Sequence, residues 1–200
     1  MVNANQENNV VQEGYITFEQ MNTIIAFQNL WNDLAEWMRF FLVSLLGDLG
    51  SLQATITRMY VKVPLDFYNA LQVFYGPQLA QQFLNLLSSF IVAAWRLAEA
   101  MKAGDSKAAD TGTVQLYQIA DKISTFLASI NVYWAQTQWR TLFNQFIRLW
   151  VEGLQAFLTQ NFEQGISLYD RSKDLTVAMG DYMARGIIAR QLTSKELPQA

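Results

Sequence analysis

Three apolar stripes with a helical period recur along this chain at a fixed spacing. Steps of three and four residues keep such side chains on one face of a helix. The first stripe consists of Trp31, Leu34, Met38, Phe41 and Leu45. The pattern returns 56 residues later as Leu87, Phe90, Ala94, Leu97 and Met101, and again as Phe143, Phe146, Trp150, Gly153 or Leu154, and Phe157. Because the same helical stripe occurs three times, the chain is predicted to be an all-α array of repeated units.

The residues after each stripe predict where the helices turn. Gly47-Asp48 follows the first stripe, Gly104-Asp105 follows the second, and Asn161 holds the equivalent place after the third. Glycine just past a helix C-terminus adopts a positive φ, and Asp or Asn beside it accepts N–H bonds of the next helix. Gly47 and Gly104 are therefore predicted as C′ residues, and Asp48, Asp105 and Asn161 as N-caps. The pairs lack the glycine spacing and the lysine of a phosphate loop.

Short turns between long helices make neighbouring helices antiparallel. The prediction is a six-helix antiparallel bundle built from three helical hairpins, with an internal repeat of 56–57 residues. Gly76-Pro77 separates the first two hairpins, and Thr17 with Gln20 has the spacing of a capping box for the first helix. The predicted parts are a polar N-terminal tail at 1–16, a single bundle domain at 17–192 with units at about 17–76, 77–133 and 134–192, and a frayed C-terminal tail at 193–200.

The composition of the chain excludes most common catalytic mechanisms. The chain has no Cys and no His, so it lacks thiolate nucleophiles, imidazole bases and the usual ligands of transition metals. Carboxylates remain as metal ligands, but Asp170 and Asp174 lie beside Arg171 and Lys173, a pattern typical of a solvated helix face. The sequence therefore predicts no catalytic residues, no metal site, no cofactor and no enzyme activity.

Charge and hydropathy bear on partners and location. The net charge is −3 with no basic block, so no nucleic-acid partner is expected. The N-terminal residues lack the features of a signal peptide. The longest apolar runs, 40–46 and 90–95, are shorter than the roughly 20 residues of a membrane span. The expectation is a cytoplasmic protein without a transmembrane segment.

Surface composition favours self-association as the leading function. Charged residues are 16% of the chain, against about 25% in typical domains, and a neutral surface associates readily. Aromatic side chains on such a surface are typical of interfaces. The connector at 132–139 carries Tyr133, Trp134 and Trp139. These three residues are the predicted contact of a homo-oligomer or a protein partner.

A second interpretation comes from the inner stripes. Leu34, Phe90, Phe146 and Trp150 form a candidate apolar seam or cavity. Such a seam would bind an apolar small molecule, and the neutral helix faces would suit a lipid or granule surface. Core packing is the competing explanation for the same side chains.

Several motifs resemble a family of small helical proteins of clostridia and bacilli whose function is not established. The motifs are LGDLGSLQATITR (46–58), PLDF (64–67), FYG (74–76), AEAMKAGD (98–105), ADKISTFLASIN (120–131), YW (133–134) and GDYMARGI (180–187). The resemblance implies a threefold-repeated helical hairpin and no known activity. The family carries His where this chain has Leu34, Phe90 and Phe146, and an acidic residue of its pattern falls on Ser51. The resemblance therefore implies that apolar side chains fill any site those His residues would form.

Overall fold

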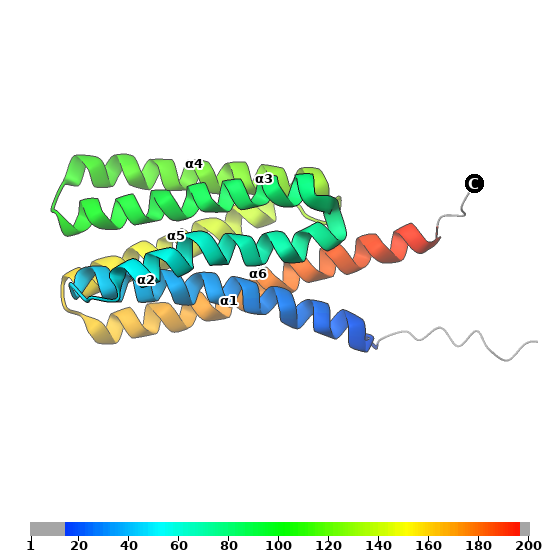
Figure 1. The fold of residues 1–200 in the computed structure, drawn as a ribbon, viewed down its shortest axis with the longest axis horizontal. Coiled ribbons are helices and arrows are strands. Elements are labelled where there is room, and N and C mark those ends of the chain that lie inside the picture. Colours follow the sequence, from blue (N-terminus) through cyan, green and yellow to red (C-terminus); the bar gives the residue numbers. More distant parts are fainter. Residues whose placement is uncertain (1–14, 197–200) are drawn as a thin grey trace, which may run out of the picture.

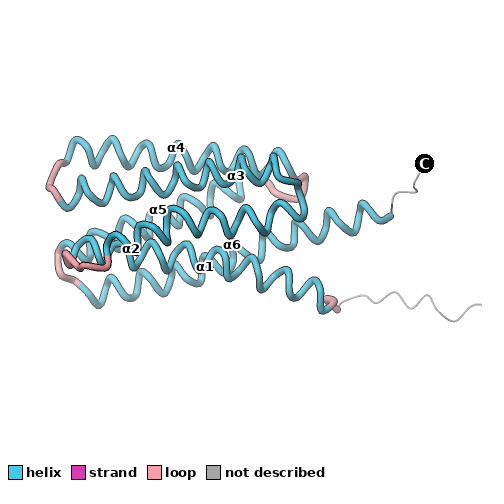
Figure 2. Tube along the Cα trace, in the orientation of Figure 1, coloured by secondary structure: helices cyan, strands magenta, loops and turns pink. Residues whose placement is uncertain are grey.

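The computed structural model describes residues 15–196, with side chains as far as Thr193, and these residues form helices and turns without a strand (Figures 1 and 2). The elements are α1 (Phe18–Leu46), α2 (Leu52–Thr57), the π-helical turn η1 (Arg58–Lys62), α3 (Val63–Lys102), α4 (Ser106–Ile130), α5 (Gln136–Leu158) and α6 (Phe162–Glu196). The all-α prediction is confirmed. Most of the predicted N-terminal tail and residues 197–200 lie outside the described residues, and α6 continues past the predicted end at 192.

Glycine and proline shape the long helical stretch from α2 to α3. Gly76 has φ 78° and ψ 167°, so α3 consists of two helical parts that meet there. Figure 1 shows these parts running in opposite directions, as Gly76-Pro77 predicted. Pro64 lacks an N–H group, and the wider turn of η1 ends two residues before it, at Lys62. A π-helical turn of this kind absorbs a local break in the α-helical hydrogen bonds without ending the helix.

The packing of the helices closes the array. α3 packs against α4, α4 against α5, and α5 against α6, while the first helix, α1, packs against the last, α6. Gly180 in α6 allows this last approach, because a Cβ atom there would lie 2.4 Å from the Cα atom of Gln28. Thr176 also donates a hydrogen bond to the Asn32 side chain across the same contact, at 2.7 Å. The ends of the helical array therefore meet, as in a bundle rather than an open solenoid.

Three turns share one backbone geometry. Left-handed φ values occur at Asp48 (51°), Gly104 (72°) and Gln160 (59°), which are 56 residues apart. In each turn the next N–H donates to a carbonyl five residues earlier. These bonds are Leu49 to Ser44 at 3.0 Å, Asp105 to Ala100 at 3.0 Å, and Asn161 to Ala156 at 2.8 Å. This pattern is the Schellman motif, which satisfies carbonyl groups at a helix C-terminus.

The first turn differs from its prediction. Gly47 has φ −85° and is the C-cap, whereas Asp48 occupies the left-handed C′ position. Asp48 is not an N-cap, because α2 begins only at Leu52; its carboxylate pairs with the Lys102 ammonium group instead. Aspartate tolerates the left-handed region better than most residues. The predicted roles of Gly47 and Asp48 are therefore wrong.

The other predicted caps are confirmed. Gly104 holds the C′ position, and Asp105 accepts a hydrogen bond from the Ala108 N–H at 3.0 Å. Asn161 accepts from the Gln164 N–H at 3.3 Å. At the start of α1, Thr17 and Gln20 form the predicted capping box.

The inner stripes make up the core. Leu34, Phe90 and Phe146 are 0%, 0% and 1% exposed, so their predicted burial is confirmed. The Phe90 ring lies 5.8 Å from the Phe143 ring and 6.3 Å from the Phe146 ring. Trp31 lies 5.6 Å from the same Phe143 ring, which joins the first and third stripes. The second and third stripes meet through Phe90.

Candidate functional site

Trp134 and Trp139 do not form a surface contact. They are 1% and 0% exposed, so the prediction that they lie at an interface is wrong. Trp139 stacks on Trp31 with ring centroids 5.8 Å apart. Trp134 packs against Gly186 of α6, where a Cβ atom would lie 2.0 Å from the indole nitrogen. Both indoles therefore point into the core, and Gly186 of α6 leaves the space that the Trp134 ring occupies.

Tyr133 is the one predicted interface residue that remains accessible. It is 42% exposed, and its hydroxyl hydrogen-bonds the Thr193 hydroxyl at 2.6 Å. The next residues are tied to α6 as well, since the Ala135 N–H donates to the Tyr182 hydroxyl at 2.7 Å. Tyr133 thus anchors the connector to α6.

Exposed apolar side chains gather instead on the first turns of α1. Phe18, Met21 and Ile25 are 72%, 39% and 46% exposed. Their spacing of three and four residues places them on one face of the helix; these three residues are called the α1 apolar face below. Figure 1 shows this end of α1 extending past the turn between the two parts of α3, while α6 extends farther still. The spacing of Phe18, Met21 and Ile25 is visible in the sequence. The prediction for this helix, however, covers only the stripe that begins at Trp31 and places that stripe in the core.

A crevice lies between α1, α5 and α6. Its apolar walls are Ala35, Leu42, Phe146, Leu149, Trp150, Gly153 and Leu168, and its polar residues are Arg39, Tyr169 and Ser172. The space open to the centre of a water molecule is about 30 Å³, within a hollow of about 340 Å³ that includes open solvent. Two of the predicted seam residues, Phe146 and Trp150, line the crevice, whereas Leu34 and Phe90 do not. The crevice is therefore narrow, apolar and bordered by a cation.

The Arg39 guanidinium group is held by aromatic rings. It lies 4.5 Å from the centroid of the Phe157 ring and 5.0 Å from that of Tyr169. Its Nη1 donates to the Gly165 carbonyl at 2.9 Å. Burial lowers the pKa of Arg39, and the charges of Tyr169 and Asp170 partly oppose this change. Burial also raises the pKa of the Tyr169 phenol. These contacts fix the position of a half-buried cation.

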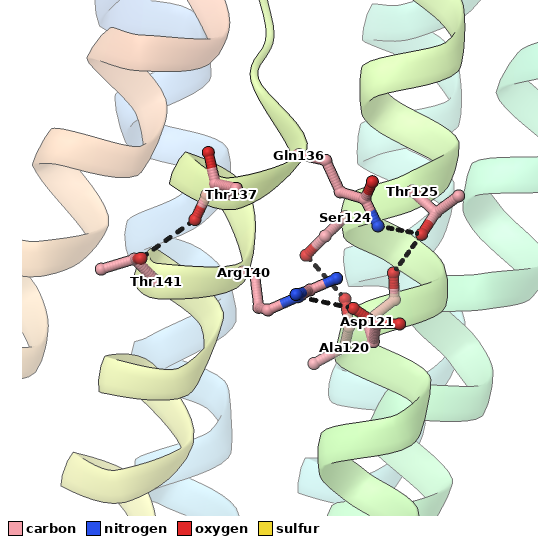
Figure 3. A network of polar contacts seen from close by, with 8 residues as sticks. All are labelled: Ala120, Asp121, Ser124, Thr125, Gln136, Thr137, Arg140 and Thr141. Atoms are coloured by element: carbon pink, nitrogen blue, oxygen red, sulfur yellow. Dashed lines mark hydrogen bonds and ion pairs between the residues drawn. The ribbon is translucent and has the colours of Figure 1, made fainter.

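Polar networks elsewhere join helices. Between α4 and α5, Arg140 Nε donates to Asp121 Oδ1 at 2.7 Å and the Gln136 amide donates to the Thr125 hydroxyl at 2.8 Å (Figure 3). Both partners of the ion pair are about half exposed. An exposed pair of this kind contributes about 0.2–1 kcal/mol. The network ties α4 to α5.

A second network lies beside the π-helical turn. Arg58 donates to Asp33 at 3.0 Å and to Asp66 at 2.8 Å, which links α1 to α3. Its guanidinium group also lies 5.3 Å from the Trp37 ring centroid. Within residues 15–196, no three acidic side chains come together as metal ligands would.

One part of the chain meets the length and composition of a membrane span. It is Leu52–Lys102, with a mean hydropathy of 1.3 in its most apolar window, of which 44% is buried inside the bundle. The sequence prediction that no stretch approaches a span counted only unbroken apolar runs. A core helix of a water-soluble protein meets the same criteria, so the stretch is weak evidence for a membrane.

The resemblance to clostridial and bacillar helical proteins stays a prediction. Comparison with known proteins finds no matching family model, no matching curated protein and no matching solved structure.

Proposed function

We propose that this protein is a non-catalytic helical bundle that self-associates, and that the α1 apolar face is the contact between copies. The observation that carries the proposal is the exposure of Phe18, Met21 and Ile25 on one side of a single helix. Burial of a large apolar side chain stabilises an association by about 1.5–3 kcal/mol. A neutral surface opposes this contact weakly.

The spacing of the face suits a twofold contact. In an antiparallel pair of α1 helices centred near Met21, Phe18 of one copy lies opposite Ile25 of the other. A twofold axis needs such a self-complementary surface. Glu19 is the one charged residue from Phe18 to Asn32, so like charges do not line the contact. The capping box at Thr17 and Gln20 keeps the end of the helix formed up to the face.

A charged double variant tests this contact. We expect wild-type protein to form a dimer at micromolar concentration, and Phe18→Glu/Ile25→Glu to weaken dimerisation by more than about tenfold. The variant removes two apolar side chains and places carboxylates opposite each other across the axis. Sedimentation equilibrium measures both dissociation constants. Phe18 lies in the first helical turn, where glutamate is favourable, and Ile25 is 46% exposed, so the monomer should stay folded.

Val114→Glu is the matched control. Val114 is 58% exposed on α4, which packs against α3 and α5 rather than α1. We expect its dimerisation to equal that of wild type. A wild-type species of 22.9 kDa at high concentration would contradict self-association. A dimer that the double variant leaves intact would contradict the α1 apolar face as the contact.

We propose further that the bundle consists of six helices in three hairpins related by an internal repeat of 56–57 residues. The three Schellman turns at Asp48, Gly104 and Gln160 support this proposal, because their spacing equals that of the apolar stripes. The break at Gly76 supports it as well, because it divides α3 into one part for each of the first two hairpins. Self-association does not depend on this repeat.

A further inference from the structure

The crevice between α1, α5 and α6 exists because one stripe lacks a side chain. Gly153 stands where the first stripe has Phe41 and the second has Leu97, each 56 residues apart. Gly153 is buried, yet a Cβ atom built there would meet no other atom within 4 Å. The neighbouring Leu154 is 0% exposed and fills the core in its place. The third helical hairpin thus leaves room where its counterparts are filled.

Three hydrogen-bond donors on this crevice have spare capacity. Arg39 has no carboxylate within ion-pair distance among the described residues, and its hydrogen bond to the Gly165 carbonyl uses one of its five N–H groups. Ser172 is 7% exposed, and its hydroxyl makes no hydrogen bond within the described part of the chain. Trp150 is also 7% exposed, with an indole N–H that has no partner there. Within the described residues, unpaired indole N–H groups also occur at Trp31, Trp95, Trp134 and Trp139, so the Arg39 cation without a carboxylate partner there is what distinguishes this crevice.

The position of the Arg39 guanidinium group is fixed before any anion binds. Phe157 and Tyr169 hold the guanidinium group by their rings, and the Gly165 carbonyl fixes one edge. A guanidinium group held in this way loses little conformational entropy when a carboxylate binds it through two parallel hydrogen bonds. The carboxylate of Asp170 also acts on Arg39, but Asp170 is exposed to solvent and makes no ion pair with it within the described residues.

We infer that this crevice is a binding site for a small monocarboxylate with a short apolar chain. The carboxylate lies at Arg39, in the crevice that Ser172 and Trp150 also line, and the chain lies against Leu42, Leu149 and Leu168. The space of about 30 Å³ holds about two water molecules, so a short chain fits better than a long-chain fatty acid, and part of that chain lies in the hollow that is open to solvent. This site is separate from the α1 apolar face and does not depend on self-association.

Hexanoate is the probe, with hexan-1-ol as the same chain without the charge. Saturation-transfer NMR and titration calorimetry should detect saturable hexanoate binding to wild type at millimolar concentration. Arg39→Gln should weaken it by about tenfold, because a charge-assisted hydrogen bond is lost. Gly153→Leu should abolish it, since the added side chain occupies the crevice. Hexan-1-ol should bind the wild type about as weakly as hexanoate binds Arg39→Gln.

Folding of each variant is checked by thermal unfolding in circular dichroism. Should Gly153→Leu fail to fold, Gly153→Ala takes its place and should weaken hexanoate binding severalfold, because its Cβ atom enters open space. Gly112→Ala on α4 is the matched control and should bind like wild type. An absence of saturable binding to wild type would overturn the inference. Equal binding by wild type, Arg39→Gln and a folded Gly153 variant would overturn it as well.

Discussion

Replacing Gly180 with alanine is expected to destabilise the bundle by about 2–3 kcal/mol, because the added methyl group strikes backbone. A Cβ atom at Gly180 would lie 2.4 Å from Gln28 Cα, 2.6 Å from Gln28 N and 2.8 Å from the carbonyl carbon of Phe27. Backbone atoms of a helix cannot rotate away, so α1 and α6 must separate. Their separation also strains the hydrogen bond from Thr176 to Asn32. The gain in helix propensity of about 1 kcal/mol offsets only part of this cost.

Gly153→Ala is the matched control for Gly180→Ala. Both glycines are buried within helices, but a Cβ atom at Gly153 meets nothing within 4 Å. Alanine there should leave the free energy of unfolding unchanged or raise it by up to about 1 kcal/mol. Denaturant unfolding followed by circular dichroism measures both variants. Equal stability of the two variants would show that α1 and α6 do not approach through Gly180.

Local features of the fold were open to prediction. The capping box at Thr17, the break at Gly76 and the caps at Asp105 and Asn161 depend on residues within a few positions of each other. The apolar stripes gave the buried faces because helical spacing alone decides which side chains share a side. Asp48 shows the limit of such reasoning. Its neighbour Gly47 is the better residue for a positive φ, yet the register of the chain places the left-handed turn on Asp48.

The candidate sites depended on contacts between distant segments. Trp134 is buried because Gly186 makes room for its ring. Gly186 lies far from Trp134 in the sequence, so the residues around Trp134 do not predict this contact. Arg39 has its hydrogen-bond partner, Gly165, on another helix. Whether Gly153 or Leu154 completed the third stripe was left open by periodicity. Tertiary packing decides it, because Leu154 enters the core and the space at Gly153 stays open.

Truncation of the inner stripes to alanine is expected to have the largest effect on stability. Phe90→Ala and Phe146→Ala should each lower the free energy of unfolding by about 3–5 kcal/mol, and Leu34→Ala by about 2–5 kcal/mol. Each side chain is almost fully buried, so its loss removes apolar contacts and leaves a cavity. Phe90 should lie at the upper end, because its ring contacts both Phe143 and Phe146. Denaturant unfolding at a fixed protein concentration measures these differences.

Phe40→Ala is the matched control for Phe90→Ala, because it deletes the same phenyl ring from a half-exposed position. Phe40 is 45% exposed on α1, and its ring contact is with the half-buried Trp37, 5.3 Å away. Since half of this side chain already lies in solvent, its truncation should cost about 1 kcal/mol. Phe90→Ala and Phe40→Ala delete the same atoms, so their difference measures burial. If Phe90→Ala cost no more than Phe40→Ala, the Phe90 ring would not be enclosed, and the three stripes would not meet in one core.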